Sequence, residues 1–388
     1  MELNGGMRQL RFGVAGLKDI KDLKGSIEFC VDNGYSACEV QFVKEFTLDE
    51  AECAKLGSIA RDQGVALSVH APYFAQLTTK EPDRIKQHLG ALHHSCKLGS
   101  QLGATVIVCH PGSRGEASAE ELVERVDANL RALGPRVGDL GVKLGLETCG
   151  RRSQFGSLGD IALLVREHAF TTPVIDYGHI HALSNGSLRD KAAFDALFSY
   201  IIQEFSSEHL WPLHTHFSDN QFGDAGELRH IPYGTGTLKI GNVLEGARPH
   251  DLALTVISEH KDPASHAAVR DELKSKKAPL IPPMPRATSL REKQGSWLPH
   301  AIPLEERGEA HYFQRGSREL RVTNVAKMYF PDDEITKGDL IGYYYNAAPL
   351  MLPFLRDRPI TMQRVPEGIY GEAFYEKQIP RGAPGWVK

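Results

Sequence analysis

Eight short apolar runs, rich in β-branched residues, recur through the first two thirds of this 388-residue chain. Their starts lie 26 to 41 residues apart, which leaves room for a loop and a helix after each run. This spacing is typical of parallel β-strands joined by helical crossovers. The runs are RFGVA (11–15), ACEVQF (37–42), ALSV (66–69), TVIVC (105–109), KLGLE (143–147), PVID (173–176), LHTHF (213–217) and LTVIS (254–258). Eight such units predict an α/β fold, a closed (β/α)8 barrel, with an open doubly wound sheet as the alternative.

The amino-acid composition and the periodicity of the chain change near residue 275. Residues 276–315 are rich in proline and lack helical or strand periodicity, so we expect a linker there. Residues 316–388 regain strand-like alternation and an aromatic helical stretch. Residues 1–275 carry 28 Lys+Arg, 36 Asp+Glu and 15 of the 17 histidines, whereas residues 276–388 carry 17 Lys+Arg and 13 Asp+Glu. The net charge of −4 is therefore the sum of −8 and +4, and carboxylates and imidazoles are concentrated in the predicted barrel.

Six consecutive runs end at, or close to, a side chain that can bind a metal ion. These side chains are His70, His110, Glu147, Asp176 with His179, His216 and Glu259. The carboxyl ends of barrel strands form one rim, so we expect these groups to meet. A single histidine at a strand end is usually structural, but so many buried ionisable groups would be unfavourable by several kcal/mol without a compensating cation. The six cysteines form no CxxC pair, and oxygen and imidazole ligands suit Zn²⁺, Mn²⁺ or Fe²⁺.

The spacing of the residues does not decide which of three histidines could bind a metal ion. His214 and His216 share one face of their strand, so alternation does not choose between them. His181 is expected either to orient His179 or to cap a loop.

Successive motifs recur across residues 10–270: SVHAPYFAQL (68–77), VCHPGS (108–113), LETCGRRSQFGSL (146–158), VIDYGHIHA (174–182), HFSDNQFGDAGELRHIPYGTG (216–236) and VISEH (256–260). In combination they resemble the motifs of endonuclease IV, the zinc-dependent apurinic/apyrimidinic endonuclease. The resemblance implies a centre of three zinc ions. In this sequence His70 and His110 would hold one ion, Glu147 would bridge it to a second ion held by Asp176, His216 and Glu259, and His179 and His230 would hold the third.

The family pattern is broken at one position. It places an aspartate two residues before the histidine equivalent to His230, and this chain has Leu228 there. Glu227, one residue further away, is the candidate replacement; otherwise the third ion is weak or missing.

The resemblance also implies an activity and a partner. Clustered metal ions hydrolyse phosphodiesters without a protein nucleophile, so we expect cleavage 5′ to abasic sites in duplex DNA, as part of DNA repair, with Glu147 and Glu259 as catalytic residues and two or three Zn²⁺, or Mn²⁺, as cofactors. Tyr73 and Phe74 match the pair that enters the DNA stack in that family. The alternative for both rings is that they pack the loop.

Sugar isomerases and epimerases provide the rival interpretation. They share this barrel and use one divalent ion held by a Glu, Asp, His, Glu set, which here would be Glu147, Asp176, His216 and Glu259. The additional histidines favour the nuclease. A DNA-binding module without turnover is the third possibility.

The carboxy-terminal segment carries a second resemblance. Residues 318–388, with TKGDLIGYYYNAAPLMLPFLRDRPITMQR at 336–364, resemble the beginning of the primase-type polymerase domain of bacterial DNA ligase D. The expected architecture is thus a barrel, a proline-rich linker and an incomplete α+β segment over 316–388. That segment contains no Asp-x-Asp metal pair, so we expect no polymerase activity from it, and end-joining proteins are its expected partners.

The remaining expectations concern location. The first residues lack the basic-then-apolar pattern of a signal peptide, and no window approaches the roughly 20 apolar residues of a membrane span. We expect a cytoplasmic protein without a membrane partner.

Overall fold

A computed structural model describes residues 7, 9–16, 23–42, 46, 48–283, 304–307, 310–315, 318–331, 335–355, 361–371 and 373–376. The chain divides into two compact units, Met1–Pro285 and Arg286–Lys388.

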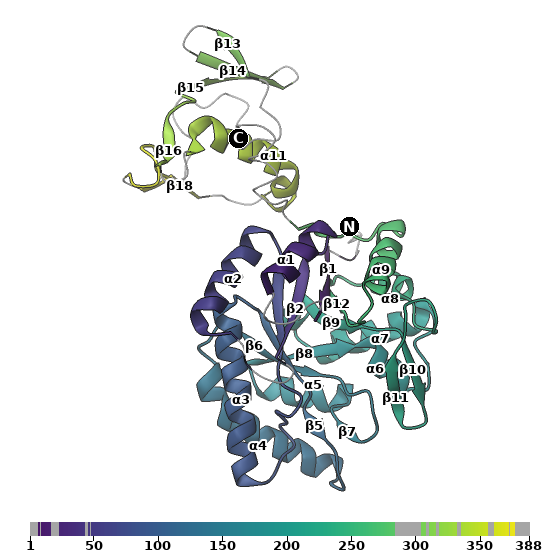
Figure 1. The fold of residues 1–388 in the computed structure, drawn as a ribbon. Helices are drawn as coiled ribbons and strands as arrows, with labels where there is room; N and C mark the ends of the chain where they lie inside the picture. Colours follow the sequence, from purple (N-terminus) through teal and green to yellow (C-terminus); the bar gives the residue numbers. More distant parts are fainter. Residues whose placement is uncertain are drawn as a thin grey trace. The chain divides into compact units, whose positions relative to one another are not determined.

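The first unit is built on a closed barrel of eight parallel strands (Figure 1). The strands are β1 (Gln9–Ala15), β2 (Ala37–Gln41), β3 (Ala66–His70), β4 (Val106–Cys109), β6 (Lys143–Glu147), β8 (Thr171–Asp176), β9 (Leu213–Phe217) and β12 (Ala253–Ser258). Each corresponds to one of the eight apolar runs, so the predicted barrel is confirmed. Because β1 pairs in parallel with both β12 and β2, the sheet closes, and the open doubly wound alternative is excluded.

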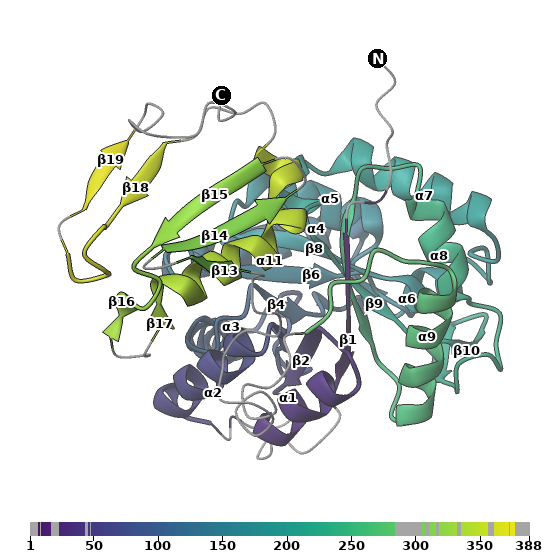
Figure 2. The same ribbon diagram turned by 90° about the horizontal axis from the view of Figure 1, so that it is seen from above.

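The helices lie outside the strands (Figure 2). They are α1 (Leu23–Asp32), α2 (Glu50–Asp62), α3 (Pro82–Gln101), α4 (Ala119–Val137), α5 (Leu158–Glu167), α6 (Tyr177–Leu183), α7 (Lys191–Glu204), α8 (Ile240–Ala247) and α9 (Pro263–Ser275), with a 3₁₀ turn at Ser207–His209. Capping boxes begin α2, α4 and α5, where Asp49, Ser118 and Ser157 each accept from the third residue of the helix. The buried face of α4 carries Leu122 and Val126, which shows how a 3.6-residue period directs one stripe onto the sheet.

Two small antiparallel pairs of strands are formed by the loops that follow barrel strands. β5 (Gly112–Ser113), after β4, pairs with β7 (Gln154–Phe155), after β6, and the loop after β9 forms a hairpin of β10 (Asn220–Gly223) and β11 (Gly226–His230). A bridge between Arg151 and Gly226 joins the loop after β6 to this hairpin. These additions all lie at the carboxyl end of the barrel, where they surround the predicted site.

The barrel continues beyond residue 275. Leu10 N donates to Pro279 O at 2.9 Å, and Ile281 N donates to Leu10 O at 2.9 Å. The predicted linker also contains two strands, β13 (Leu304–Arg307) and β14 (Ala310–Arg315), while its residues 284–303 lie outside the described residues. We expected a linker over 276–315, and its described residues include both the pairing with Leu10 and the strands β13 and β14; neither leaves a periodic signal in so short a stretch.

The second unit combines small sheets with one long helix. β13, β14 and β15 (Arg318–Thr323) form an antiparallel sheet, β16 (Met328–Phe330) pairs with β17 (Ile335–Thr336), and β18 (Met362–Arg364) pairs with β19 (Phe374–Glu376). Helix α11 spans Lys337–Leu355. Within the described part of the chain, no helix has the length and apolar character that crossing a membrane requires.

Candidate metal centre

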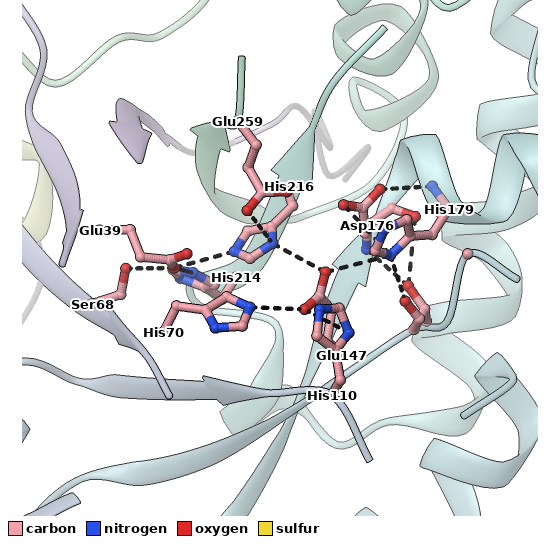
Figure 3. A network of polar contacts seen from close by, with 12 residues as sticks. Glu39, Ser68, His70, His110, Glu147, Asp176, His179, His214, His216 and Glu259 are labelled. Carbon is pink, nitrogen blue, oxygen red and sulfur yellow. Dashed lines mark hydrogen bonds and ion pairs between the residues drawn. The ribbon is translucent and has the colours of Figure 1, made fainter. Parts of the chain in front are cut away.

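The predicted ligands meet in one cluster at the carboxyl end of the barrel (Figure 3). A cavity of about 630 Å³ opens onto it. Its lining includes Tyr73, His110, Glu147, Arg151, His179, Glu227, Arg229, His230, Glu259 and Lys261. Most predicted ligands lie at the end of a barrel strand or directly after it, while His216 is the penultimate residue of β9, His179 lies in the first turn of α6 and His230 ends β11.

Glu147 occupies the middle of the cluster. Its Oε2 lies 3.5 Å from His70 Nε2 and 3.3 Å from His110 Nδ1. Its Oε1 lies 3.3 Å from His216 Nδ1 and 3.4 Å from His179 Nδ1. One carboxylate therefore contacts two groups of potential ligands, the arrangement that a bridging ligand requires.

Two groups of the predicted ligands bring their ligand atoms within 4.8 Å of one another. The first is His70, His110 and Glu147, and the second is Glu147, Asp176, His216 and Glu259. In the second, His216 Nδ1 lies 3.4 Å from Glu259 Oε1. Burial, reinforced by the neighbouring Glu147 and Asp176 carboxylates against the opposing effect of His216, raises the pKa of Glu259 to about 7. Without a bound ion these carboxylates repel each other, and a divalent cation would relieve that repulsion.

Three of the histidines are anchored through one ring nitrogen. Nδ1 of His70 lies 2.8 Å from Ala71 O, Nδ1 of His179 lies 2.8 Å from Thr148 O, and Nδ1 of His230 lies 2.7 Å from Glu259 O. A carbonyl oxygen can only accept, so Nδ1 carries the proton in each ring. In the neutral ring Nε2 then keeps its lone pair, as metal-ligating histidines require.

Several buried atoms of the cluster have no hydrogen bond. They are Glu147 Oε2, Asp176 Oδ2 and His110 Nδ1. Burial lowers the pKa of His110 to about 4, so its ring is neutral at pH 7 and can act as a ligand. Orphaned buried acceptors are unfavourable by about 1–3 kcal/mol each, and a cation would satisfy them. The donor set of imidazole and carboxylate thus fits Zn²⁺ or Mn²⁺; the six cysteines are all buried free thiols outside it.

A β-bulge explains the departure at Leu228. Asn220 pairs with His230 and Gln221 with Arg229, but Phe222 pairs with Glu227 and not with Leu228. Cross-strand partners share a face, so the bulge puts Glu227 on the same face of the hairpin as His230, while the Leu228 side chain is 56% exposed.

Glu227 reaches the remaining two histidines. Its Oε1 lies 3.5 Å from His230 Nε2 and its Oε2 lies 3.8 Å from His179 Nε2, with Asn220 donating to Oε2 at 3.0 Å. Although burial opposes the charged imidazole, the carboxylates around the two rings raise the pKa of His179 to about 9 and of His230 to about 10. The structure thus brings together His179, His230 and Glu227 at the edge of the cluster.

The residues that the sequence left undecided have distinct surroundings. His216 contacts Glu147 and Glu259, whereas His214 lies 3.2 Å from Glu39. His181 is fully buried and structural, since its Nδ1 accepts from Leu188 N at 3.1 Å and its Nε2 lies 2.8 Å from Thr237 Oγ1.

Sequence reasoning missed Glu39, a buried carboxylate in β2. Its Oε2 lies 3.1 Å from His216 Nε2. The available signal was a charged residue between the apolar residues Cys38 and Val40 of a strand, where alternation directs Glu39 to the face opposite its neighbours.

Two aromatic rings follow β3 beside the cluster. Tyr73 is 49% exposed, lines the cavity and stacks on His110 with ring centroids 5.4 Å apart. Phe74 is also exposed and has its ring 6.1 Å from that of His88. Both rings are therefore available at the rim, and Tyr73 is the one that contacts the cluster.

Comparison with known proteins agrees with this architecture. Residues 27–278 match the family described as the xylose isomerase-like TIM barrel. The chain belongs to this family. The relatives and structural neighbours of this xylose isomerase-like chain include enzymes of more than one kind.

Curated relatives match the barrel. An uncharacterized protein of Methanocaldococcus jannaschii is 27% identical over 253 residues, which are 64% of this chain and 91% of that protein. A probable endonuclease 4 of Acholeplasma laidlawii is 25% identical over 187 residues, 46% of this chain and 62% of that protein.

Solved structures share the fold. A D-tagatose 3-epimerase-like protein has a TM-score of 0.54 and 21% identity, and the match covers 69% of this chain and 97% of that protein. Endonuclease IV from Thermus thermophilus also has a TM-score of 0.54, with 18% identity over 68% of this chain and 99% of that protein. Both an epimerase-like protein and an endonuclease therefore use this barrel.

The carboxy-terminal segment has separate relatives. Residues 336–388 match the LigD primase-polymerase domain. The multifunctional non-homologous end joining protein LigD of Mycolicibacterium smegmatis is 39% identical over 69 residues, 18% of this chain but only 9% of that protein. The predicted resemblance of this segment to the LigD domain is thus confirmed.

Proposed function

We propose that the chain is a metal-dependent phosphodiester hydrolase, an apurinic/apyrimidinic endonuclease that cleaves duplex DNA 5′ to abasic sites. One observation carries the proposal. Four histidines outside the Glu147, Asp176, His216 and Glu259 group face its carboxylates or Glu227; they are His70, His110, His179 and His230. A single ion would not require these histidines as ligands, whereas a centre of two or three Zn²⁺ would.

The ligand assignment follows the contacts. His70 and His110 would hold one ion, Glu147 would bridge it to a second ion held with Asp176, His216 and Glu259, and His179, His230 and Glu227 would hold a third. Such ions, Zn²⁺ or alternatively Mn²⁺, would polarise the phosphodiester and lower the pKa of a bound water. Glu227 supplies the carboxylate that the family pattern places at residue 228.

The protein groups then have defined tasks. Glu147 would be shared by two ions, because its two oxygens contact different histidines. Glu259 lines the cavity, and in this proposal its carboxylate would accept a proton from an attacking water. Arg151, Arg229 and Lys261 line the same cavity and would neutralise the phosphate backbone.

Tyr73 and Phe74 would contact the DNA. An exposed aromatic pair next to the reactive groups can insert between bases and stabilise a bent duplex with an extruded nucleotide. Since Tyr73 stacks on His110, this insertion would occur directly above the metal centre.

The alternative function is a sugar isomerase or epimerase with one ion. The compact group of Glu147, Asp176, His216 and Glu259 and the fold shared with an epimerase-like protein favour it. The further histidines count against it.

For the second unit we propose a role in docking to end-joining proteins. The support is its likeness to a short part of LigD, and the sequence 316–388 lacks an Asp-x-Asp pair for nucleotidyl transfer.

The decisive experiment pairs metal analysis with two activity assays on the full chain. We expect two or three zinc ions per chain and incision of a duplex on the 5′ side of a single abasic site, with no incision by the Glu259→Gln variant. A single Mn²⁺ with ketose epimerisation and no incision would establish the isomerase instead.

A further inference from the structure

A buried carboxylate lies behind His216, on the opposite edge of its ring from the cluster. Nδ1 of His216 faces Glu147 and Glu259, and its Nε2 lies 3.1 Å from Glu39 Oε2 (Figure 3). Glu39 extends from β2 and is 1% exposed. The described residues that line the cavity over the metal centre do not include Glu39, and its hydrogen-bond contact with the ligand group is made to the His216 ring.

The position of Glu39 selects one form of that ring. Nδ1 can bind a metal ion only if its lone pair is free, which requires the proton to be on Nε2. An ionised carboxylate accepts hydrogen bonds and donates none, so Glu39 favours the Nε2–H tautomer. A carboxylate behind a ligating imidazole also makes the ligand nitrogen more basic.

Two further side chains hold Glu39 in place. Ser68 Oγ donates to Glu39 Oε2 at 2.9 Å, and His214 Nε2 lies 3.2 Å from the same oxygen. Ser68 comes from β3 and His214 from β9, so side chains from two other strands fix the carboxylate. This network explains why a second histidine precedes His216 by two residues on the same face.

Glu39, His214 and His216 could also be considered an ion site of their own, since their ligand atoms lie within 4.8 Å of one another. Glu39 Oε1 has no hydrogen bond. However, both imidazoles and Ser68 converge on Oε2 at hydrogen-bond distances, which leaves that oxygen saturated with donors. The geometry favours a hydrogen-bonded support over a fourth ion.

We propose that Glu39 is a positioning residue that holds His216 in the metal-binding tautomer and thereby raises the affinity of the Glu147, Asp176, His216 and Glu259 group for a divalent ion. This inference rests on the metal centre of the proposed function, and it is independent of the substrate.

The test measures Zn²⁺ affinity of the full chain by competition with a chelator. Glu39→Gln keeps the side-chain shape but removes the charge, and we expect affinity to fall roughly 10- to 100-fold, with the number of ions at saturation unchanged. Ser68→Ala should weaken binding less, by about 2- to 10-fold. Asp127→Asn is the matched control, because it removes the charge of a carboxylate that contacts a different histidine: Asp127 Oδ1 lies 2.9 Å from His168 Nε2, and neither residue belongs to the metal centre. The zinc affinity of this variant should equal that of the wild type.

A spectroscopic measurement separates positioning from a general loss of structure. In zinc-loaded protein with ¹⁵N-labelled histidine, His216 should show a single Nε2–H tautomer in the wild type and a mixture in Glu39→Gln. Wild-type affinity in Glu39→Gln would overturn the proposal, and so would the loss of one whole ion at saturation, which would make Glu39 a direct ligand. If Glu39→Gln does not fold, a folded Ser68→Ala protein with wild-type affinity would overturn it.

The two proposals fail in different ways. A wild-type chain that binds zinc but does not incise DNA refutes only the endonuclease, and the Glu39 test still applies. A wild-type chain that binds no zinc refutes both.

Discussion

The bulge that turns Glu227 toward His230 makes a prediction at two adjacent positions. Glu227→Gln preserves the shape of the side chain and removes its charge. Leu228→Asp introduces the residue of the family pattern at a side chain that is 56% exposed. If the bulge decides which residue faces the ions, Glu227→Gln should weaken zinc binding and Leu228→Asp should leave zinc binding almost unchanged.

The contacts set the size of the effect. Unit charges 3.5 Å apart, the distance from Glu227 Oε1 to His230 Nε2, attract by about 5 kcal/mol at an effective dielectric constant near 20, before solvent screening reduces it. In the metal-free Glu227→Gln protein the pKa of His230 should therefore fall from about 10 toward its ordinary value of 6.5. Loss of a carboxylate that binds the third ion directly should lower the affinity for that ion by at least about 100-fold, or about 2.7 kcal/mol. Even the loss of a hydrogen-bond partner of a ligand typically lowers metal affinity roughly 10- to 100-fold.

The assay is zinc content after dialysis against a zinc buffer, together with histidine titration by NMR. We expect one ion fewer in Glu227→Gln and wild-type content in Leu228→Asp, whose stability should stay within about 0.5 kcal/mol of the wild type. Wild-type zinc content and affinity in Glu227→Gln, or tighter binding in Leu228→Asp, would refute the assignment of Glu227 as the replacement ligand.

Other predictions concern catalysis, pH, packing and the end of the barrel. Glu259→Gln should lower the incision rate by at least about 100-fold with an unchanged circular dichroism spectrum, and near wild-type incision would remove Glu259 from the catalytic site. Carboxylates overcome burial and raise the pKa of His179 to about 9, so the native metal-free protein holds a proton that the unfolded chain releases above pH 6.5. This group alone should lower the free energy of unfolding by on the order of 3 kcal/mol between pH 6.5 and 9 in urea titrations, and His230, with its pKa raised to about 10, should add a decrease of similar size; a flat profile would contradict this. Gly13→Ala should destabilise the barrel by about 1–3 kcal/mol, because the added Cβ would clash with the Ala37 carbonyl oxygen in the neighbouring strand; an unchanged melting temperature would show that the strands can separate. Truncation after residue 275 should cost about 2 kcal/mol relative to truncation after residue 285, because it removes the two backbone hydrogen bonds to Leu10, and equal melting temperatures would argue against that pairing.

Local sequence pattern was enough to predict the barrel and most of the side chains that meet in the cluster. Each strand is a local apolar run, and the right-handed crossover rule turns eight such runs with helix-length spacings into one topology. The ends of β3, β6 and β8 carry His70, Glu147 and Asp176 as their last residues, so parallel pairing alone brings these groups to one rim. No long-range information was needed for this step.

Contacts that depend on register between distant segments became visible only in the folded chain. Glu39 meets His216 across 177 residues of sequence, and only the closed barrel places the two side chains together. The choice of Glu227 over Leu228 depends on one bulge in the hairpin register, which reverses the facing of adjacent residues. Local pattern fixes which face of its own strand a residue occupies, but the partner it meets is set by how strands align, and that alignment is a property of the folded chain.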